Sequence, residues 1–140
     1  MLKDADFRDT NMLMGSTILI IDDDPEIVRL LKIGMEEDGY STVAGYDGQM
    51  ALNLARTRKP DLIIMDVQMP MTSGLKALEF IRKTPETKDI PVIFLSGARS
   101  DMVYPAITSA QRVAFVKKPL DLEHISSLVR QFLSQYRAAA

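Results

Sequence analysis

Five short apolar runs recur along the chain and predict buried strands. They lie at residues 18–21, 42–44, 62–65, 92–95 and 114–116, and three of them are rich in Ile, Val and Leu. Runs that are apolar at successive positions are typical of strands covered on both faces, as in a parallel sheet. The runs therefore predict a five-stranded parallel sheet.

The segments between these runs carry helical periodicity. In the first, Asp24 fits the N-cap, Pro25 fits the first helical position and Gly39 fits the C-terminal cap. Four apolar side chains are expected together on one face of this helix: Ile27, Leu30, Leu31 and Met35.

Further helices are expected at about residues 49–56, 74–83 and 121–136, with another around Pro105 before the last strand. Five strands alternating with five helices predict an α/β fold, a doubly wound parallel sheet with helices on both sides. Ligands of such folds bind beyond the carboxyl ends of the strands. That edge is therefore where functional residues are expected.

Composition narrows the class of protein. A chain of 140 residues forms one domain, and a net charge of −2 gives no reason to expect a nucleic-acid surface. The absence of Cys excludes a disulfide framework, a Cys-based zinc site and a thiol nucleophile. The single His124 does not make a His-based metal site alone.

The ends of the chain carry weaker signals. No apolar run approaches the ~20 residues of a membrane helix, and the polar N-terminus lacks the apolar stretch of a signal peptide. We therefore expect a cytoplasmic protein. Residues 1–15 are expected to be a loose extension, residues 16–137 the domain, and residues 138–140 a tail, either cloning residue or a frayed helix end.

Polar side chains directly follow four of the predicted strands. Asp22 and Asp23 follow the first strand, Asp66 the third, Ser96 the fourth, and Lys118 comes just after the fifth. Like charges about 4 Å apart repel by roughly 4 kcal/mol at an effective dielectric of ~20, so converging carboxylates need a cation among them. Oxygen ligands with room for water suit Mg²⁺. The sequence therefore predicts a magnesium site at this edge.

Four segments carry a resemblance to a known family. The segments "ILIIDDDP", "PDLIIMDVQMPMTSG", "IPVIFLSG" and "FVKKP" resemble the receiver domain of bacterial two-component response regulators, the group that includes the single-domain chemotaxis regulator. The resemblance covers about residues 16–137, and it implies a flavodoxin-like sheet with strand order 2-1-3-4-5.

The resemblance also implies residue roles in phosphorylation. Asp66 matches the aspartate that accepts a phosphoryl group from a histidine kinase or a phosphotransfer protein. Asp22 and Asp23, with Asp66 and the backbone carbonyl of Gln68, match the ligands of Mg²⁺, for which Mn²⁺ is an alternative.

Other matched positions concern catalysis and switching. Ser96 matches the hydroxyl that bonds to the phosphoryl group, and Lys118 matches the lysine that pairs with it, with a cis bond to Pro119. Phe115 matches the aromatic residue that changes rotamer on activation, and Gly74 matches a glycine after the phosphorylation loop.

The implied output is a conformational change. It affects a surface formed by the expected fourth helix, the strand at residues 114–116 and the last helix, and this surface controls a protein partner or a covalent output domain absent from this chain. No direct contact with nucleic acid or membrane is expected, and a phosphorylation-dependent homodimer remains open. The segment "SDMVYPAITSAQRVAF", residues 100–115, departs from the family pattern, so partner choice does not carry over.

Three other functions fit less well. A receiver converted to a phosphorylation-independent interaction module would normally have lost a site residue, and here all are present. A phosphohydrolase with an aspartyl-phosphate intermediate commonly needs a second acid where Gln68 stands. A flavodoxin-like electron carrier needs a phosphate-binding loop where the acidic residues 22–24 would repel phosphate.

Overall fold

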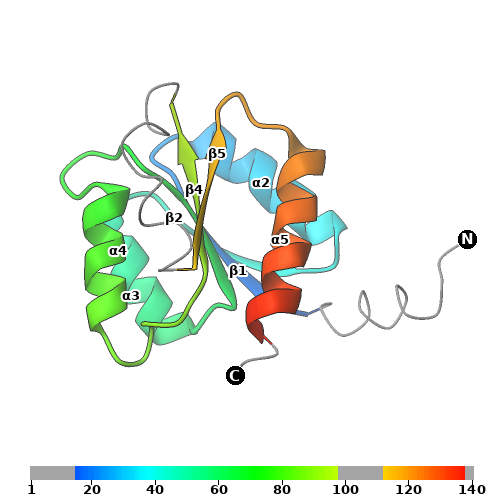
Figure 1. Ribbon diagram of the computed structural model, residues 1–140. Coiled ribbons are helices and arrows are strands. Elements are labelled where there is room, and N and C mark those ends of the chain that lie inside the picture. The colour runs from blue at the N-terminus through cyan, green and yellow to red at the C-terminus, as the bar shows by residue number, and fades with distance from the viewer. Residues whose placement is uncertain (1–14, 98–111, 138–140) are drawn as a thin grey trace, which may run out of the picture.

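The computed structural model describes residues 15–97 and 112–137, which form one parallel sheet between two layers of helices (Figure 1). The strands are β1 (Thr17–Ile21), β2 (Ser41–Gly45), β3 (Leu62–Asp66), β4 (Val92–Ser96) and β5 (Val113–Lys117). They pair in parallel in the order β2-β1-β3-β4-β5. The predicted sheet and its strand order are therefore confirmed.

Helices of the described residues are α2 (Pro25–Glu37), α3 (Gly48–Arg58), α4 (Gly74–Lys83) and α5 (Leu122–Arg137). Helices α2 and α5 cover one face of the sheet, and α3 and α4 cover the other (Figure 1). The helix expected around Pro105 lies outside the described residues, so four of the five expected helices are observed.

Alternation along the strands explains both layers, because successive strand side chains point to opposite faces. Ile18, Ile20 and Ile64 pack against α2 and α5, whereas Leu19 and Ile63 pack toward α3 and α4. All five side chains are fully buried. Each apolar run thus contributes side chains to the cores on both faces of the sheet. The polar residues are left at its carboxyl edge.

Helix α2 has the caps that its sequence predicts. Asp24 accepts a hydrogen bond from the Glu26 backbone N–H at 2.9 Å, and Pro25 begins the helix. At the other end Gly39 has a φ of 95°, and the N–H of Tyr40 donates to the Met35 carbonyl at 3.1 Å. This left-handed termination, which favours glycine, returns the chain into β2.

The predicted buried face of α2 was partly wrong. Val28, Leu31 and Met35 are buried, but Leu30 is 43% exposed. At roughly 3.6 residues per turn, position 30 falls on the far side of the helix from position 28. The buried stripe follows the spacing of Val28, Leu31 and Met35, and Leu30 faces solvent.

Candidate functional site

Three carboxylates meet at the carboxyl edge of the sheet. Asp22 and Asp23 directly follow β1, and Asp66 is the last residue of its neighbour β3. One ligand oxygen from each lies within 4.8 Å of the others. Asp22 is fully buried and Asp66 is 5% exposed, whereas Asp23 is exposed. The convergence predicted from strand ends is therefore present in the structure.

Lys118 is the basic side chain at this cluster. Its Nζ lies 3.4 Å from Asp22 Oδ2 and 3.5 Å from Asp66 Oδ2. Backbone N–H groups donate to the other two oxygens, from Asp24 to Asp22 Oδ1 at 2.9 Å and from Gln68 to Asp66 Oδ1 at 3.3 Å. Asp22 Oδ2 nonetheless accepts no hydrogen bond of good geometry from the described residues.

Electrostatics at the cluster disfavour the ionised carboxylates. Burial raises the pKa of Asp22, and the adjacent Asp66 raises it further, against the Asp24 N–H and Lys118, which lower it. Burial likewise raises the pKa of Asp66, against the lowering effect of Lys118 and the Gln68 N–H. One ammonium group does not balance three carboxylates of which two, Asp22 and Asp66, are buried.

The donor set fits a divalent cation. The three converging groups are oxygen ligands, one of them ends in a buried oxygen that lacks a hydrogen bond, and Asp23 opens to water. Mg²⁺ prefers oxygen ligands and keeps several waters, so it matches a site built on few protein groups. The carboxylates of Asp22, Asp23 and Asp66 could thus hold Mg²⁺.

Ser96 lies beside Asp66 through strand pairing. Leu95 is the register partner of Asp66, so Ser96 follows at the same edge, and its carbonyl accepts from the Lys118 N–H at 2.9 Å. Ser96 is fully buried, and its Oγ has no hydrogen-bond partner within residues 15–97 and 112–137. A buried hydroxyl without a partner is uncommon and marks a place where a ligand oxygen could bind.

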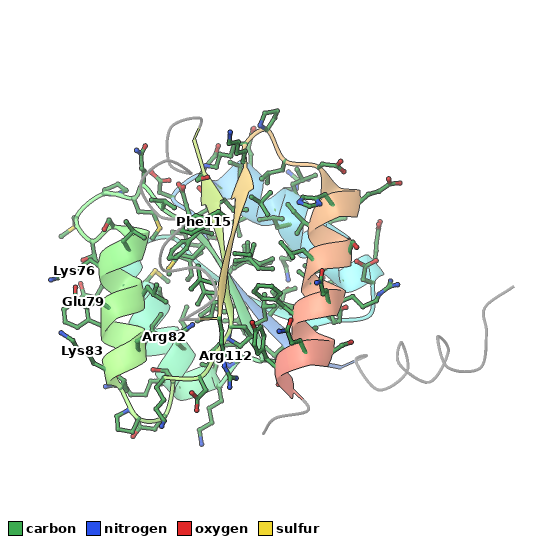
Figure 2. All side chains as sticks on the ribbon, in the orientation of Figure 1. Lys76, Glu79, Arg82, Lys83, Arg112 and Phe115 are labelled. Atoms are coloured by element: carbon green, nitrogen blue, oxygen red, sulfur yellow. The ribbon has the colours of Figure 1, made fainter. Side chains whose placement is uncertain are left out.

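Phe115 lies on β5, on the side of the sheet that faces α3 and α4. Its ring stacks on Phe94 of β4 with the centroids 5.3 Å apart, and the side chain is partly buried (Figure 2). It therefore shares the strand pair β4–β5 with Ser96, but it is a core-packed aromatic in this conformation.

The loop at residues 67–73 is held tightly behind Asp66. The Gly74 N–H donates to the Val67 carbonyl at 2.8 Å, and a Cβ at Gly74 would overlap the Asp66 carbonyl. A Cβ added at Gly48, at the start of α3, would likewise overlap the Thr72 carbonyl. The match of Gly74 to a family position was made from the sequence. The Gly48–Thr72 contact was missed, because it joins two turns that no local pattern relates.

The peptide bond between Lys118 and Pro119, just after β5, is cis. Among the helices of residues 15–97 and 112–137, none combines the length and the apolar character needed to cross a membrane.

Known proteins share this sequence pattern and fold. The sequence model of the response regulator receiver domain matches residues 18–130. The polar-differentiation response regulator DivK of Brucella anthropi is 29% identical over 120 residues, which cover 86% of this chain and 98% of that protein. The response regulator GtcR of Aneurinibacillus migulanus is 43% identical over 88 residues, 63% of this chain and 35% of that protein.

Solved structures agree with the sequence match. A putative response regulator from Chloroflexus aurantiacus superposes with a TM-score of 0.78 at 26% identity, covering 86% of this chain and 98% of that one. The signal receiver domain of a signal transduction histidine kinase from Syntrophus aciditrophicus gives a TM-score of 0.74 at 33% identity, covering 86% and 92%. With the sheet order, the acidic cluster and the matched span in agreement, the chain belongs to the receiver domains of response regulators, the switches of two-component signalling.

Proposed function

We propose that this receiver domain accepts a phosphoryl group on Asp66 in a Mg²⁺-dependent reaction and thereby switches a protein-binding surface. The observation that carries the proposal is the set of unsatisfied groups around Asp66. Asp22 Oδ2 and Ser96 Oγ are buried without hydrogen bonds from the described residues, and Lys118 Nζ reaches both buried carboxylates. Such groups are costly for a fold unless a ligand uses them.

Asp66 is the nucleophile. One of its carboxylate oxygens attacks phosphorus, an O–P bond forms, and the N–P bond of a donor phosphohistidine breaks. The reaction needs Asp66 ionised, and the charge of Lys118 favours that form against the burial that raises its pKa. The Gln68 N–H, 3.3 Å from Oδ1, helps to hold the carboxylate in place.

Ser96 and Lys118 receive the transferred group. The Ser96 hydroxyl donates to a phosphoryl oxygen, which gives the buried Oγ the partner it lacks. Lys118 pairs with another oxygen and offsets charge that develops during transfer. The same groups then position the acyl phosphate for in-line attack by water, which returns the domain to its resting state.

The carboxylates of Asp22, Asp23 and Asp66 and the backbone carbonyl of Gln68 would hold the metal, with Mn²⁺ as an alternative to Mg²⁺. When bound, the divalent cation neutralises charge on the carboxylates and on the phosphoryl oxygens. Asp22 is the most buried of these side chains, so it is the one that most needs the added charge.

The output passes through the strand pair that carries Ser96 and Phe115. A phosphoryl group adds about −1.5 to −2 charge and strong acceptor oxygens, which draw Ser96 toward Asp66. Movement of Ser96 frees space for Phe115 to turn further inward from its partly buried position, which alters the surface of β5 and α5. Moving a two-state equilibrium from 1:99 to 99:1 takes about 5.5 kcal/mol, within reach of a few charge-assisted hydrogen bonds.

Receiver domains of this family interact with histidine kinases and downstream partners. For this chain we infer a histidine kinase or phosphotransfer protein as donor, in the cytoplasm. The altered surface would bind a protein partner, an output domain or a second copy of the chain.

Intact mass spectrometry tests the proposal. The protein is mixed with Mg²⁺ and acetyl phosphate and measured at once, beside Asp66→Asn and a chelator-treated sample. A gain of one phosphoryl group in the wild type alone supports Asp66 as acceptor and the cluster as its metal site. An equal gain in Asp66→Asn, or no gain in a folded protein that binds Mg²⁺, would contradict it.

A further inference from the structure

The loop beside the phosphoacceptor contains a strained residue. Met71 has a φ of 69°, and the Thr72 N–H donates to the Pro70 carbonyl at 2.8 Å across it. This combination is that of a γ-turn with a left-handed central residue, a turn that is rare and strained for residues other than glycine. A glycine or asparagine at position 71 would adopt it more easily.

Packing does not explain the methionine. Its exposed fraction is 98%, so the side chain stands clear of the surface and contributes nothing to either core. The flanks of the turn are fixed, by the Gly74–Val67 hydrogen bond on one side and by the close approach of Gly48 to Thr72 on the other. An apolar side chain is thus presented to solvent from a rigid turn, and outliers of this kind gather at functional sites.

The position of the turn indicates which kind of partner would contact Met71. Asp66 is buried to 5% exposure at the carboxyl edge, so a protein donor must cover that edge to bring its phosphohistidine to the carboxylate. The β3–α4 loop projects from this edge beside the start of α4 (Figure 1). A small phosphodonor, by contrast, would reach Asp66 without touching the tip of the loop.

Two more exposed apolar side chains lie two positions to either side of Gly48 in the sequence. Tyr46 and Met50 are 44% and 36% exposed and flank Gly48, the residue that packs on Thr72. We call Tyr46, Met50 and Met71 the apolar rim. Unbranched methionines adapt to irregular apolar partners. Exposed Asp23 and Asp24 at the same edge favour a partner with basic residues near its histidine.

We propose that Met71 is a specificity-determining residue for the phosphodonor protein. Its side chain packs into an apolar surface beside the donor's histidine, with Tyr46 and Met50 at the margin of the contact. The inference rests on the proposed phosphorylation of Asp66 and adds the means by which a protein donor is chosen. Met71 takes no part in the bonds that form or break.

The test compares two donors on the same variants. The small donor is acetyl phosphate. To choose the protein donor, histidine kinases and phosphotransfer proteins are purified from the organism that encodes the chain, and the rate at which each phosphorylates the wild type is measured. The fastest of them is the protein donor. Variants are Met71→Gln, similar in length but polar, Met71→Gly, which relieves the strain, and Met71→Leu. Phe80→Ala, which removes a 44% exposed ring on α4, is the matched control.

For the protein donor we expect Met71→Gln and Met71→Gly to raise KM about tenfold, the effect of one well-packed interface residue, with kcat within about twofold. Met71→Leu should recover most of the loss, Phe80→Ala should match the wild type, and every variant should react normally with acetyl phosphate. An unchanged KM in Met71→Gln, equal slowing with both donors, or a panel in which no protein donor works would overturn the inference. Failure of the wild type with acetyl phosphate would instead count against the proposed function.

Discussion

The two edges of the sheet treat buried polar groups in opposite ways. At the amino edge, Asp61 Oδ2 accepts from the Thr17 N–H at 2.8 Å, and the fully buried Thr87 hydroxyl donates to the Ile81 carbonyl at 2.7 Å. At the carboxyl edge, the equally buried Ser96 hydroxyl and Asp22 Oδ2 have no such partners among the described residues. The buried polar groups of the amino edge are used within the fold, whereas those of the carboxyl edge could still bind a ligand.

Under the proposed function, this contrast separates groups that stabilise the fold from groups that bind the phosphoryl group and its metal. A buried hydrogen bond contributes about 1 kcal/mol net, whereas a buried polar group without one costs about 1–3 kcal/mol. The carboxyl edge therefore carries a stability cost that the apolar packing of both sheet faces must offset. Ligand binding would recover part of that cost, which couples occupancy of the site to the stability of the domain.

The largest expected effect is from Gly74→Ala. A Cβ at this position would overlap the Asp66 carbonyl, so the loop at residues 67–73 would have to move, at a cost of about 3 kcal/mol in unfolding free energy. Gly34→Ala is the control, because its Cβ would meet only the flexible end of Leu122 at 3.3 Å, and helix propensity favours Ala. Urea denaturation measures both. Equal losses would show that Gly74 is no special constraint.

Removing each of the two buried hydroxyls in turn tests the contrast between the edges. Thr87→Val removes the donor to Ile81 and should cost about 1–2 kcal/mol in stability with phosphorylation unchanged. Ser96→Ala removes a buried hydroxyl that has no hydrogen-bond partner among the described residues, so the free energy of unfolding should stay unchanged or rise by up to about 1–3 kcal/mol, while phosphorylation slows roughly tenfold. Denaturation midpoints and timed phosphorylation separate the effects. A large stability loss in Ser96→Ala would mean that its hydroxyl is structural.

A smaller effect is expected from pH in metal-free buffer. Because burial raises the folded-state pKa of Asp22 and Asp66 above the usual value for an aspartate, the folded state binds more protons than the unfolded state at mildly acidic pH. The contribution of these two carboxyl groups to the free energy of unfolding should therefore rise as pH falls from neutral toward about 4, the usual pKa of an aspartate. Asp66→Asn should flatten the rise. Urea midpoints across this range, with chelator present, give the sign, and a fall in stability would refute it.

The sequence predicted the elements that follow from local pattern. The apolar runs placed five strands, Asp24 and Gly39 placed the ends of α2, and strand ends brought Asp22, Asp66 and Lys118 to one edge. Parallel sheets impose that convergence, because all their carboxyl ends lie on one side. This is why a one-dimensional pattern identified a three-dimensional cluster.

The features that the sequence did not predict depend on contacts between segments that are distant along the chain. Leu30 was misplaced because a four-residue apolar set fits two faces of α2, and only packing against the sheet selects one. The approach of Gly48 to Thr72 and the left-handed turn at Met71 arise from the meeting of two loops. Whether the Thr87 or the Ser96 hydroxyl finds a partner depends equally on its neighbours in space.

The most direct test of the contrast between the edges is Mg²⁺ titration of thermal stability. The wild type is compared with Asp22→Asn, at the carboxyl edge, and with Asp61→Asn, at the amino edge. Mg²⁺ at about ten times its Kd should stabilise the wild type and Asp61→Asn by about 1.4 kcal/mol. Asp22→Asn should lose most of that gain. Equal stabilisation of all three proteins, or none in the wild type, would contradict the account of the carboxyl edge as a cation site.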